Sequence, residues 1–360
     1  MFLEELDAFS ADCSARHADI FNAERPLSVV TAAHDGLSIL TNLSADYDLR
    51  LRGAVVSVGN SSIEVRTDLL RVLRGPDASM AGAPLGKGDE EEAEELLGCC
   101  YTVMVARERD GFGKAAVHQL AGIDPHVLFE TPEGEAKAAK RRQNARRSLV
   151  ANALSHTPPQ PSEVPLLHQL WREEKQREEG KSSDGGGGEE AAVVVRVPMS
   201  ASEQRAVDLM QPSHRNMNGY MFGGYLMRRA LEVAWLSAYR FGKVRPTFAG
   251  LDEVIFKKPI ELGSMVELVG RAVFSAEDED EVRVVVEAHK LTMEDGTREP
   301  TNLFHFVFHG RNLHDASDGG TTKASESVAR HVVQPSTYEE GMLYLEGRRR
   351  WLAARQRGDA

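Results

Sequence analysis

Apolar residues recur at two different periods along the chain, and they predict two helices that are each followed by strands. At the start of the chain, Leu3, Leu6 and Ser10 fall at helical spacing, which predicts a helix over residues 2–18. A second helix is predicted over residues 223–241, where apolar or small side chains cover most of the circumference. Because such a helix must be enclosed on nearly every side, we expect a sheet to wrap around it.

The two halves of the chain repeat this order of elements. The first predicted helix precedes the β-prone segments "VVTAAHDGLSIL", "DLRLRGAVVSVGNSSIEVRTDLLRVL" and "CCYTVMVARER". The second precedes "TFAGLDEVIFKKP", "SMVELVGRAVFSAEDEDEVRVVVEAHKLT" and "TNLFHFVFHGR". Strands that follow one helix, with turn residues but no further helix between them, are typical of an antiparallel sheet. We therefore predict an α+β fold of two related units, each an antiparallel sheet wrapped around one long helix.

Two segments of low complexity interrupt this pattern. One is acidic and runs from about residue 75 to 95, and the other is rich in glycine and glutamate and ends at residue 192. Neither contains enough apolar residues to form a core, so both are predicted to be solvated insertions. The boundaries that follow are a first unit over 1–133, a linker with surface helices over 134–192, a second unit over 193–313 and a carboxy-terminal tail over 314–360.

Composition narrows the range of partners. The formal net charge of −12 over 360 residues argues against binding of nucleic acid. Cys13, Cys99 and Cys100 cannot form a disulfide framework, and no histidine or cysteine cluster has metal-ligand spacing, so no metal site is expected. No apolar run is long enough to cross a bilayer. The amino terminus is acidic, where a transit peptide would be basic, and it begins inside the first predicted helix. We therefore expect the first unit to lack the strand and loop that precede the second helix.

The start of the second predicted helix is a candidate site. Gly223 and Gly224 leave the unpaired N–H groups of the first turn accessible, at the helix end that favours negative charge. A carbonyl oxygen that gains negative charge under nucleophilic attack would be stabilised there. Asn216 and Asn218 precede the glycines and are candidates to orient a water or a carbonyl. The alternative is that the glycines only permit close packing of the helix and that the asparagines are turn residues.

Several motifs in the expected order resemble one family. The segments "NMNGYMFGGYLMRRALEVAW", "DEVIFKKPIELGSMVEL", "TNLFHFVFHG" and "STYEEGMLYLEGRRRW" resemble the second half of mitochondrial-type double-hotdog acyl-coenzyme A thioesterases, and "LEELDAFSADCSARH" and "YTVMVARE" resemble the first half. The resemblance implies two hotdog domains that hydrolyse fatty acyl-coenzyme A to a fatty acid and coenzyme A without a cofactor. It also implies a homo-oligomer, a trimer of double hotdogs. The implied location is mitochondrial, although a chain without a transit peptide leaves a cytoplasmic location open.

In the related enzymes the site is composite, with an Asn from the loop before one helix and an acid from the helix of the other domain. Matching the motifs places Asn216 at the asparagine position and Asp7 at the helix-acid position of the first domain, where the second domain has Leu231. The resemblance therefore implies one competent site of two. In it we expect Gly223 and Gly224 to bind the substrate carbonyl, Asn216 to position water, and Asp7 to act as general base or as nucleophile.

Alternatives to this interpretation remain at the level of sequence. Asp7 shares a helix flank with Ser10 and Ser14, so partial burial is expected, but a solvated Asp7 is the competing hypothesis. A catalytically inactive acyl-coenzyme A-binding or scaffold hotdog protein would fit a displaced Asp7. A hotdog hydratase or dehydratase is less favoured, because Phe222 occupies the place before the glycines where such an enzyme would need a His.

Overall fold

In a computed structural model of the chain, the two predicted helices pack on one nine-stranded sheet. The structure describes residues 2–18, 27–39, 43, 47–59, 61–74, 92–108, 138–144, 153–154, 157–179, 194–256, 258–276, 280–310 and 330–358. Most of the two predicted low-complexity insertions lies outside these ranges. Strand β4 includes residues 92–95 of the first insertion.

The first unit is one helix followed by four strands: α1 (Phe2–His17), β1 (Leu27–Ile39), β2 (Asp48–Val58), β3 (Ser62–Arg74) and β4 (Glu92–Glu108). The second unit repeats that order after an additional strand: β6 (Gln204–Leu209), α5 (Gly223–Gly242), β7 (Thr247–Phe256), β8 (Met265–Ser275), β9 (Glu281–Leu291) and β10 (Arg298–His309). Both predicted helices are therefore confirmed, with ends within one residue of the predicted ones.

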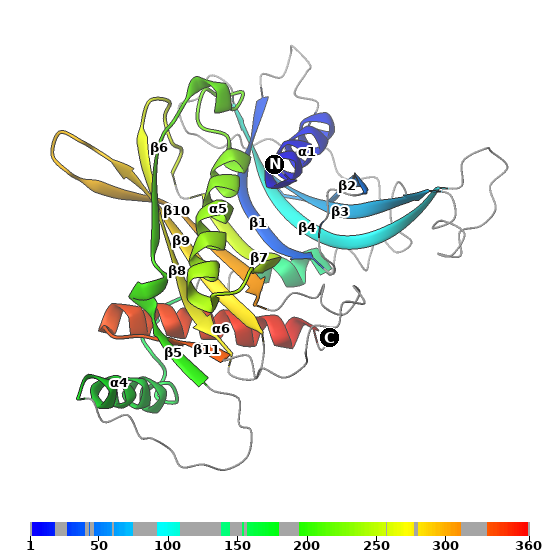
Figure 1. Cartoon of the computed structure of the whole chain (residues 1–360). Helices are drawn as coiled ribbons and strands as arrows, with labels where there is room; N and C mark the ends of the chain where they lie inside the picture. The colour runs from blue at the N-terminus through cyan, green and yellow to red at the C-terminus, as the bar shows by residue number, and fades with distance from the viewer. Residues whose placement is uncertain are drawn as a thin grey trace.

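The two units share one antiparallel sheet, with strand order β2-β3-β4-β1-β7-β10-β9-β8-β6. The units meet where β1 pairs with β7, with Leu37 opposite Leu251. Figure 1 shows α5 lying along its half of the sheet and α1 beside one end of α5. Strand β6 covers the outer edge of β8, whereas none of the described strands pairs with the outer edge of β2. The predicted α+β fold is confirmed.

The helices α1 and α5 cross near an approximate two-fold axis that relates the units. Matching Asp7 with Leu231 makes Glu4 the counterpart of Arg228, since each lies three residues earlier in its helix. Glu4 and Arg228 form an ion pair at 3.3 Å. Equivalent positions of two related elements meet only at the axis that relates them. This contact therefore supports the alignment of the two helices.

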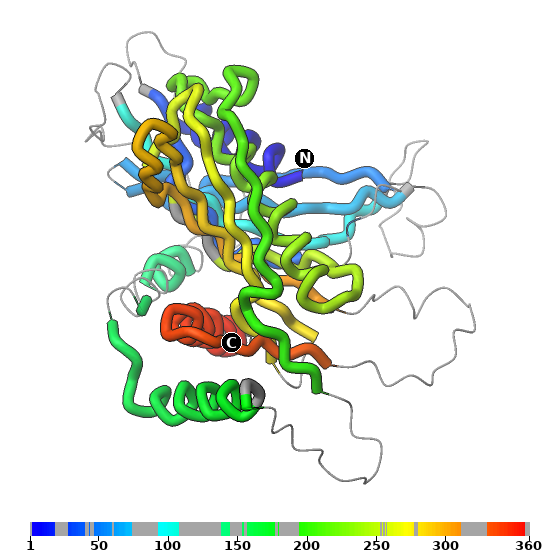
Figure 2. Tube along the Cα trace, turned by 60° about the vertical axis from the view of Figure 1, so that its left-hand side comes forward, coloured from blue at the N-terminus to red at the C-terminus, as the bar shows by residue number. Residues whose placement is uncertain are grey.

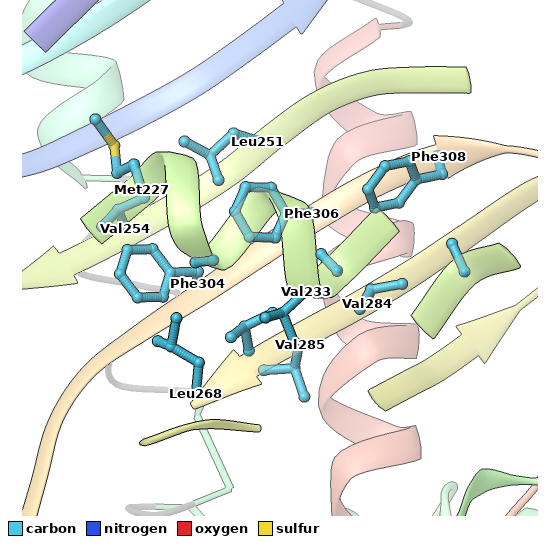
Figure 3. Close-up of a cluster of buried hydrophobic side chains, with 14 of the residues drawn as sticks. Met227, Val233, Leu251, Val254, Leu268, Val284, Val285, Phe304, Phe306 and Phe308 are labelled. Atoms are coloured by element: carbon cyan, nitrogen blue, oxygen red, sulfur yellow. The ribbon is translucent and has the colours of Figure 1, made fainter. Parts of the chain in front are cut away.

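The core of the second unit is apolar on both facing surfaces. Alternation along β10 places Phe304, Phe306 and Phe308 on one face of the sheet, and each is at most 1% exposed. They face Met227 and Val233 of α5 in the cluster drawn in Figure 3. Burial of this many aromatic and branched side chains at about 25 cal/mol per Å² is the main stabilising contribution in this half.

A helix of the predicted linker, the first strand of the predicted second unit and the predicted tail form a layer at one end of the sheet. It contains α4 (Val164–Glu178), β5 (Val194–Pro198), β11 (Arg330–Gln334) and α6 (Tyr338–Gly358). Strand β11 of the tail pairs in parallel with β5. Helix α6 packs on β8, where Phe274 contacts the rings of Tyr344 and Trp351. Figures 1 and 2 place this layer away from α1, so it does not reach the candidate site.

Candidate active site

Asp7 is the residue that joins the two units at the candidate site. Its side chain is fully buried, and its Oδ2 accepts a 2.7 Å hydrogen bond from the backbone N–H of Gly224. The N-cap residue of α5, Phe222, provides no side-chain cap, so a carboxylate from the other unit satisfies this N–H group. The partial positive charge at the helix N-terminus stabilises the carboxylate. The alternative of a solvated Asp7 is therefore wrong.

The two glycines are required by close approach as well as by chemistry. A Cβ atom at Gly224 would lie 2.8 Å from the Glu4 Cα, nearer than Cβ atoms are found to backbone atoms. A Cβ atom at Gly223 would lie 3.1 Å from Asp7 Oδ2 and 3.0 Å from Cζ of Phe256. The two interpretations of the glycine pair thus hold together: the same missing side chains let α1 approach α5 and let the carboxylate reach the backbone.

Two side chains of β1 bind the other oxygen of Asp7. Thr31 Oγ1 donates to Asp7 Oδ1 at 2.7 Å, and His34 Nε2 lies 3.1 Å from the same atom. Strand alternation would place positions 31 and 34 on opposite faces. A register shift between Thr31 and Ala33 brings both side chains to the same face. The sequence analysis did not identify either residue, because the bulge has no clear sequence signal.

Behind His34 lies a chain of hydroxyl groups inside the first unit. His34 Nδ1 is 3.0 Å from Thr102 Oγ1, and Thr102 accepts from Ser10 Oγ at 3.1 Å. Ser10 is also 3.3 Å from Thr67 Oγ1. All of these side chains are at most 1% exposed. Cys100 Sγ lies 4.0 Å from His34 Nδ1, and burial raises the pKa of its thiol, which keeps it neutral. The interior around α1 is a hydrogen-bonded polar network.

Asn216 organises the loop before α5. Its Oδ1 accepts from the backbone N–H groups of Asn218 at 2.9 Å and Tyr220 at 3.0 Å, so the turn interpretation holds for the oxygen. The loop is fixed to α5, since His214 stacks on Tyr225 with ring centroids 4.0 Å apart. Within the described residues no hydrogen bond joins Asn216 to Asp7. The Nδ2 donors of Asn216 are used by neither loop bond.

The second position that could have held an acid has none. Leu231, the counterpart of Asp7, packs against the apolar core of the second unit. The structure thus brings Asp7, Gly223 and Gly224 together, places Asn216 in the loop leading to them, and provides the acid from one unit only.

Comparison with known proteins identifies the class. Mitochondrial acyl-coenzyme A thioesterase 9 of Bos taurus is 30% identical over 349 residues, which cover 96% of this chain and 70% of that protein. The human protein of the same name is 29% identical, covering 96% of this chain and 69% of its own length. Chloroplastic acyl-coenzyme A thioesterase 2 of Humulus lupulus is 27% identical, covering 96% and 72%. No protein-family model matches the chain.

Solved structures are similar to one part of the chain at a time. The acyl-CoA hydrolase of Bacillus cereus has a TM-score of 0.38 and 20% identity, covering 45% of this chain and 90% of that chain. A hexameric acyl-CoA thioesterase has a TM-score of 0.39 and 24% identity, covering 46% and 98%.

These comparisons establish what the chain is. It belongs to the acyl-coenzyme A thioesterases, a family of thioester hydrolases. More particularly, it is of the double-hotdog type, and the relatives matched over 96% of the chain include proteins named mitochondrial acyl-coenzyme A thioesterases 9 and 10. None of the helices in the described ranges combines the length and the hydropathy needed to cross a membrane.

Proposed function

We propose that this chain hydrolyses acyl-coenzyme A at a single composite site, where Asp7 of the first hotdog domain acts at the N-terminus of α5 in the second. The observation that supports this most directly is the bond between Asp7 Oδ2 and the N–H of Gly224, which lies 217 residues away in sequence. A buried carboxylate next to a glycine-lined helix terminus combines a base with a site for developing negative charge.

The two oxygens of Asp7 have different roles in this proposal. Oδ1 is bound by Thr31 and His34, whereas the one donor to Oδ2 among the described residues is the Gly224 N–H, which leaves Oδ2 a lone pair for a water. The water oxygen attacks the thioester carbonyl carbon while Oδ2 takes its proton. The C–S bond then breaks, and the leaving thiolate of coenzyme A takes the proton back from Asp7.

The two glycine N–H groups have different roles in this proposal, whereas the sequence-based hypothesis had both bind the substrate carbonyl. The Gly224 N–H is already bound to Asp7, so Gly223 at the first helical position is the donor we assign to the carbonyl oxygen. The Nδ2 donors of Asn216 position the water. A thiolate is a good leaving group, so these steps use neither a metal ion nor a cofactor, and coenzyme A enters as part of the substrate.

Thiol release from acyl-coenzyme A tests the site. Asp7→Asn is expected to lower kcat by about 10²- to 10⁴-fold, the usual contribution of a general base. The matched control is Asp12→Asn, which removes an exposed carboxylate of the same helix that is paired only with Arg16 at 2.7 Å. Asn216→Ala is expected to lower kcat less, because a water keeps its other contacts. Wild-type activity in Asp7→Asn would refute the proposed site.

The route through Asp7 can be decided by isotope. In the general-base route, single turnover in H₂¹⁸O places the label in the fatty acid alone. In the nucleophilic route, a mixed anhydride forms, and water that attacks the Asp7 carbonyl places ¹⁸O in the protein, which mass spectrometry of the peptide containing Asp7 detects. Binding of coenzyme A without any thiol release would instead indicate the scaffold function.

For assembly and location we propose a trimer of double hotdogs in mitochondria. The names of the relatives from cattle and human support the location, and a solved thioesterase of similar fold is described as hexameric, which equals three double units. Light scattering is expected to give three chains per particle. Fractionation of cells that express the full-length protein is expected to place it with mitochondrial matrix markers. A monomer, or a cytosolic pool only, would refute the respective proposal.

A further inference from the structure

We infer that His34 is a positioning residue for hydrolysis: it holds Oδ1 of Asp7 so that Oδ2 is the reacting oxygen. This inference rests on the proposed role of Asp7. His34 itself is fully buried. It lies on β1, and both of its ring nitrogens have partners, Asp7 Oδ1 at 3.1 Å and Thr102 Oγ1 at 3.0 Å.

The partners determine the tautomer of His34. An ionised carboxylate only accepts hydrogen bonds, so Nε2 must carry the proton that points at Asp7. Nδ1 then accepts the hydroxyl hydrogen of Thr102. Together with Thr31, His34 occupies the acceptor capacity of Oδ1 with two donors, and the carboxylate cannot rotate without losing both. The remaining lone pair of Oδ2 therefore keeps one direction.

The hydroxyl chain also accommodates a second proton on the imidazole. If Nδ1 is protonated, it donates to Thr102, whose hydrogen turns to Ser10, and Ser10 donates to the Leu6 carbonyl at 2.9 Å. No heavy atom has to move. The ring therefore keeps its place and its contact with Asp7 Oδ1 whether or not Nδ1 carries a proton.

No other described group beside His34 takes over this role. From α1 it faces Asp7, and from β4 the neutral Cys100 thiol. From β7 the nearest ring is Phe256, edge-on with centroids 6.4 Å apart. Asp35 is the next residue of β1, and because neighbouring side chains of a strand alternate, it belongs to the opposite face of the strand. Removing His34 thus leaves Asp7 with two of its three donors.

The competing explanation is that His34 only fills the polar interior, and paired substitutions separate the two. His34→Gln keeps an amide donor at the position of Nε2. His34→Asn keeps a polar contact at the position of Nδ1 but does not reach Asp7. We expect kcat to stay within about fivefold of wild type in His34→Gln and to fall by roughly 10- to 100-fold in His34→Asn, the worth of a hydrogen bond to a charged group. KM is expected to stay constant in both, because His34 does not touch substrate.

The separate effects on kcat and KM supply a readout that a structural role would not move. Thr102→Val, which leaves the Asp7 contact intact, serves as the milder variant if the His34 variants unfold. It removes the hydroxyl that orients the ring at Nδ1, so kcat is expected to fall while KM and the affinity for a coenzyme A thioether stay near wild type.

The outcomes are distinguishable from those of the proposed function. Full activity in Asp7→Asn would refute the composite site itself. An inactive Asp7→Asn together with equal kcat values in His34→Gln and His34→Asn, or with an unchanged kcat in Thr102→Val, would refute the positioning role of His34 alone.

Discussion

The interiors of the two hotdog domains differ in polarity at equivalent positions. In α1 three buried positions are polar, and their counterparts in α5 are apolar; the pairs are Asp7 with Leu231, Ser10 with Ala234, and Ser14 with Ala238. The sheet shows the same change, since the β1–β4 neighbours His34 and Thr102 correspond to the β7–β10 neighbours Leu251 and Phe306.

This difference shows how a duplicated fold divides its tasks. Polar groups in an interior cost stability unless each finds a partner, and even then the net gain from a hydrogen bond is about 1 kcal/mol. The second domain instead buries aromatic and branched side chains, which stabilise it directly. The first domain provides the buried carboxylate, and the second domain provides the apolar core. The shared sheet joins the two domains where β1 pairs with β7.

The largest effect is expected from exchanging the acid between the domains. Asp7→Leu removes the base and the partner of the Gly224 N–H, so kcat is expected to fall by about 10²- to 10⁴-fold in thiol release. Adding Leu231→Asp is not expected to restore activity, because Leu231 packs against apolar core residues, where a carboxylate would lack the donors that hold Asp7. Recovery of activity in the double variant would show that the two domains are interchangeable.

Truncation of the apolar interior comes next. Phe306→Ala is expected to lower the free energy of unfolding by about 3–5 kcal/mol, because a buried ring leaves a cavity. Thr102→Ala, at the equivalent position, is expected to cost about 1–3 kcal/mol, since its partners lose a hydrogen bond. Chemical denaturation measures both. Equal losses would contradict the division of tasks between the domains.

Close packing of the helices gives a smaller effect on stability. A Cβ at Gly224 would be 2.8 Å from the Glu4 backbone, so Gly224→Ala is expected to cost about 1–3 kcal/mol and to displace Asp7 from its N–H partner. Gly242→Ala is the control, because its added Cβ meets nothing nearer than 3.6 Å. A Gly224→Ala enzyme with wild-type melting temperature and kcat would show that the helices separate easily.

The smallest effects come from two serines of α1. Ser10 is bonded to Thr102 and the Leu6 carbonyl, so Ser10→Ala is expected to destabilise by about 1 kcal/mol. The buried Oγ of Ser14 has no hydrogen-bond partner, so Ser14→Ala is expected to stabilise by a few tenths of a kcal/mol or more. Thermal unfolding of both variants would decide, and the same sign for both would contradict the assigned network.

The sequence was sufficient for the parts of the fold and site that follow from periodicity. Apolar spacing predicted both helices, and the repeat of elements predicted the α+β fold. Asp7 was proposed from the family resemblance, with the helix patterns used to align the two domains. His34 was not predicted, because its side chain reaches Asp7 only through the register shift after Thr31. The bond from Gly224 to Asp7 was not predicted either, since it depends on how closely two helices approach across 217 residues of sequence.

The ion pair between Glu4 and Arg228 is informative about the history of the chain. In an assembly of two identical subunits, a residue on the two-fold axis meets its own copy, and two like charges would repel there. Opposite charges at such a position require that the two copies be encoded separately. Fusion of two units into one chain thus allowed different residues to occupy the two sides of the axis. An ion pair at that position favours association of the two halves with each other over association of each half with a second copy of itself.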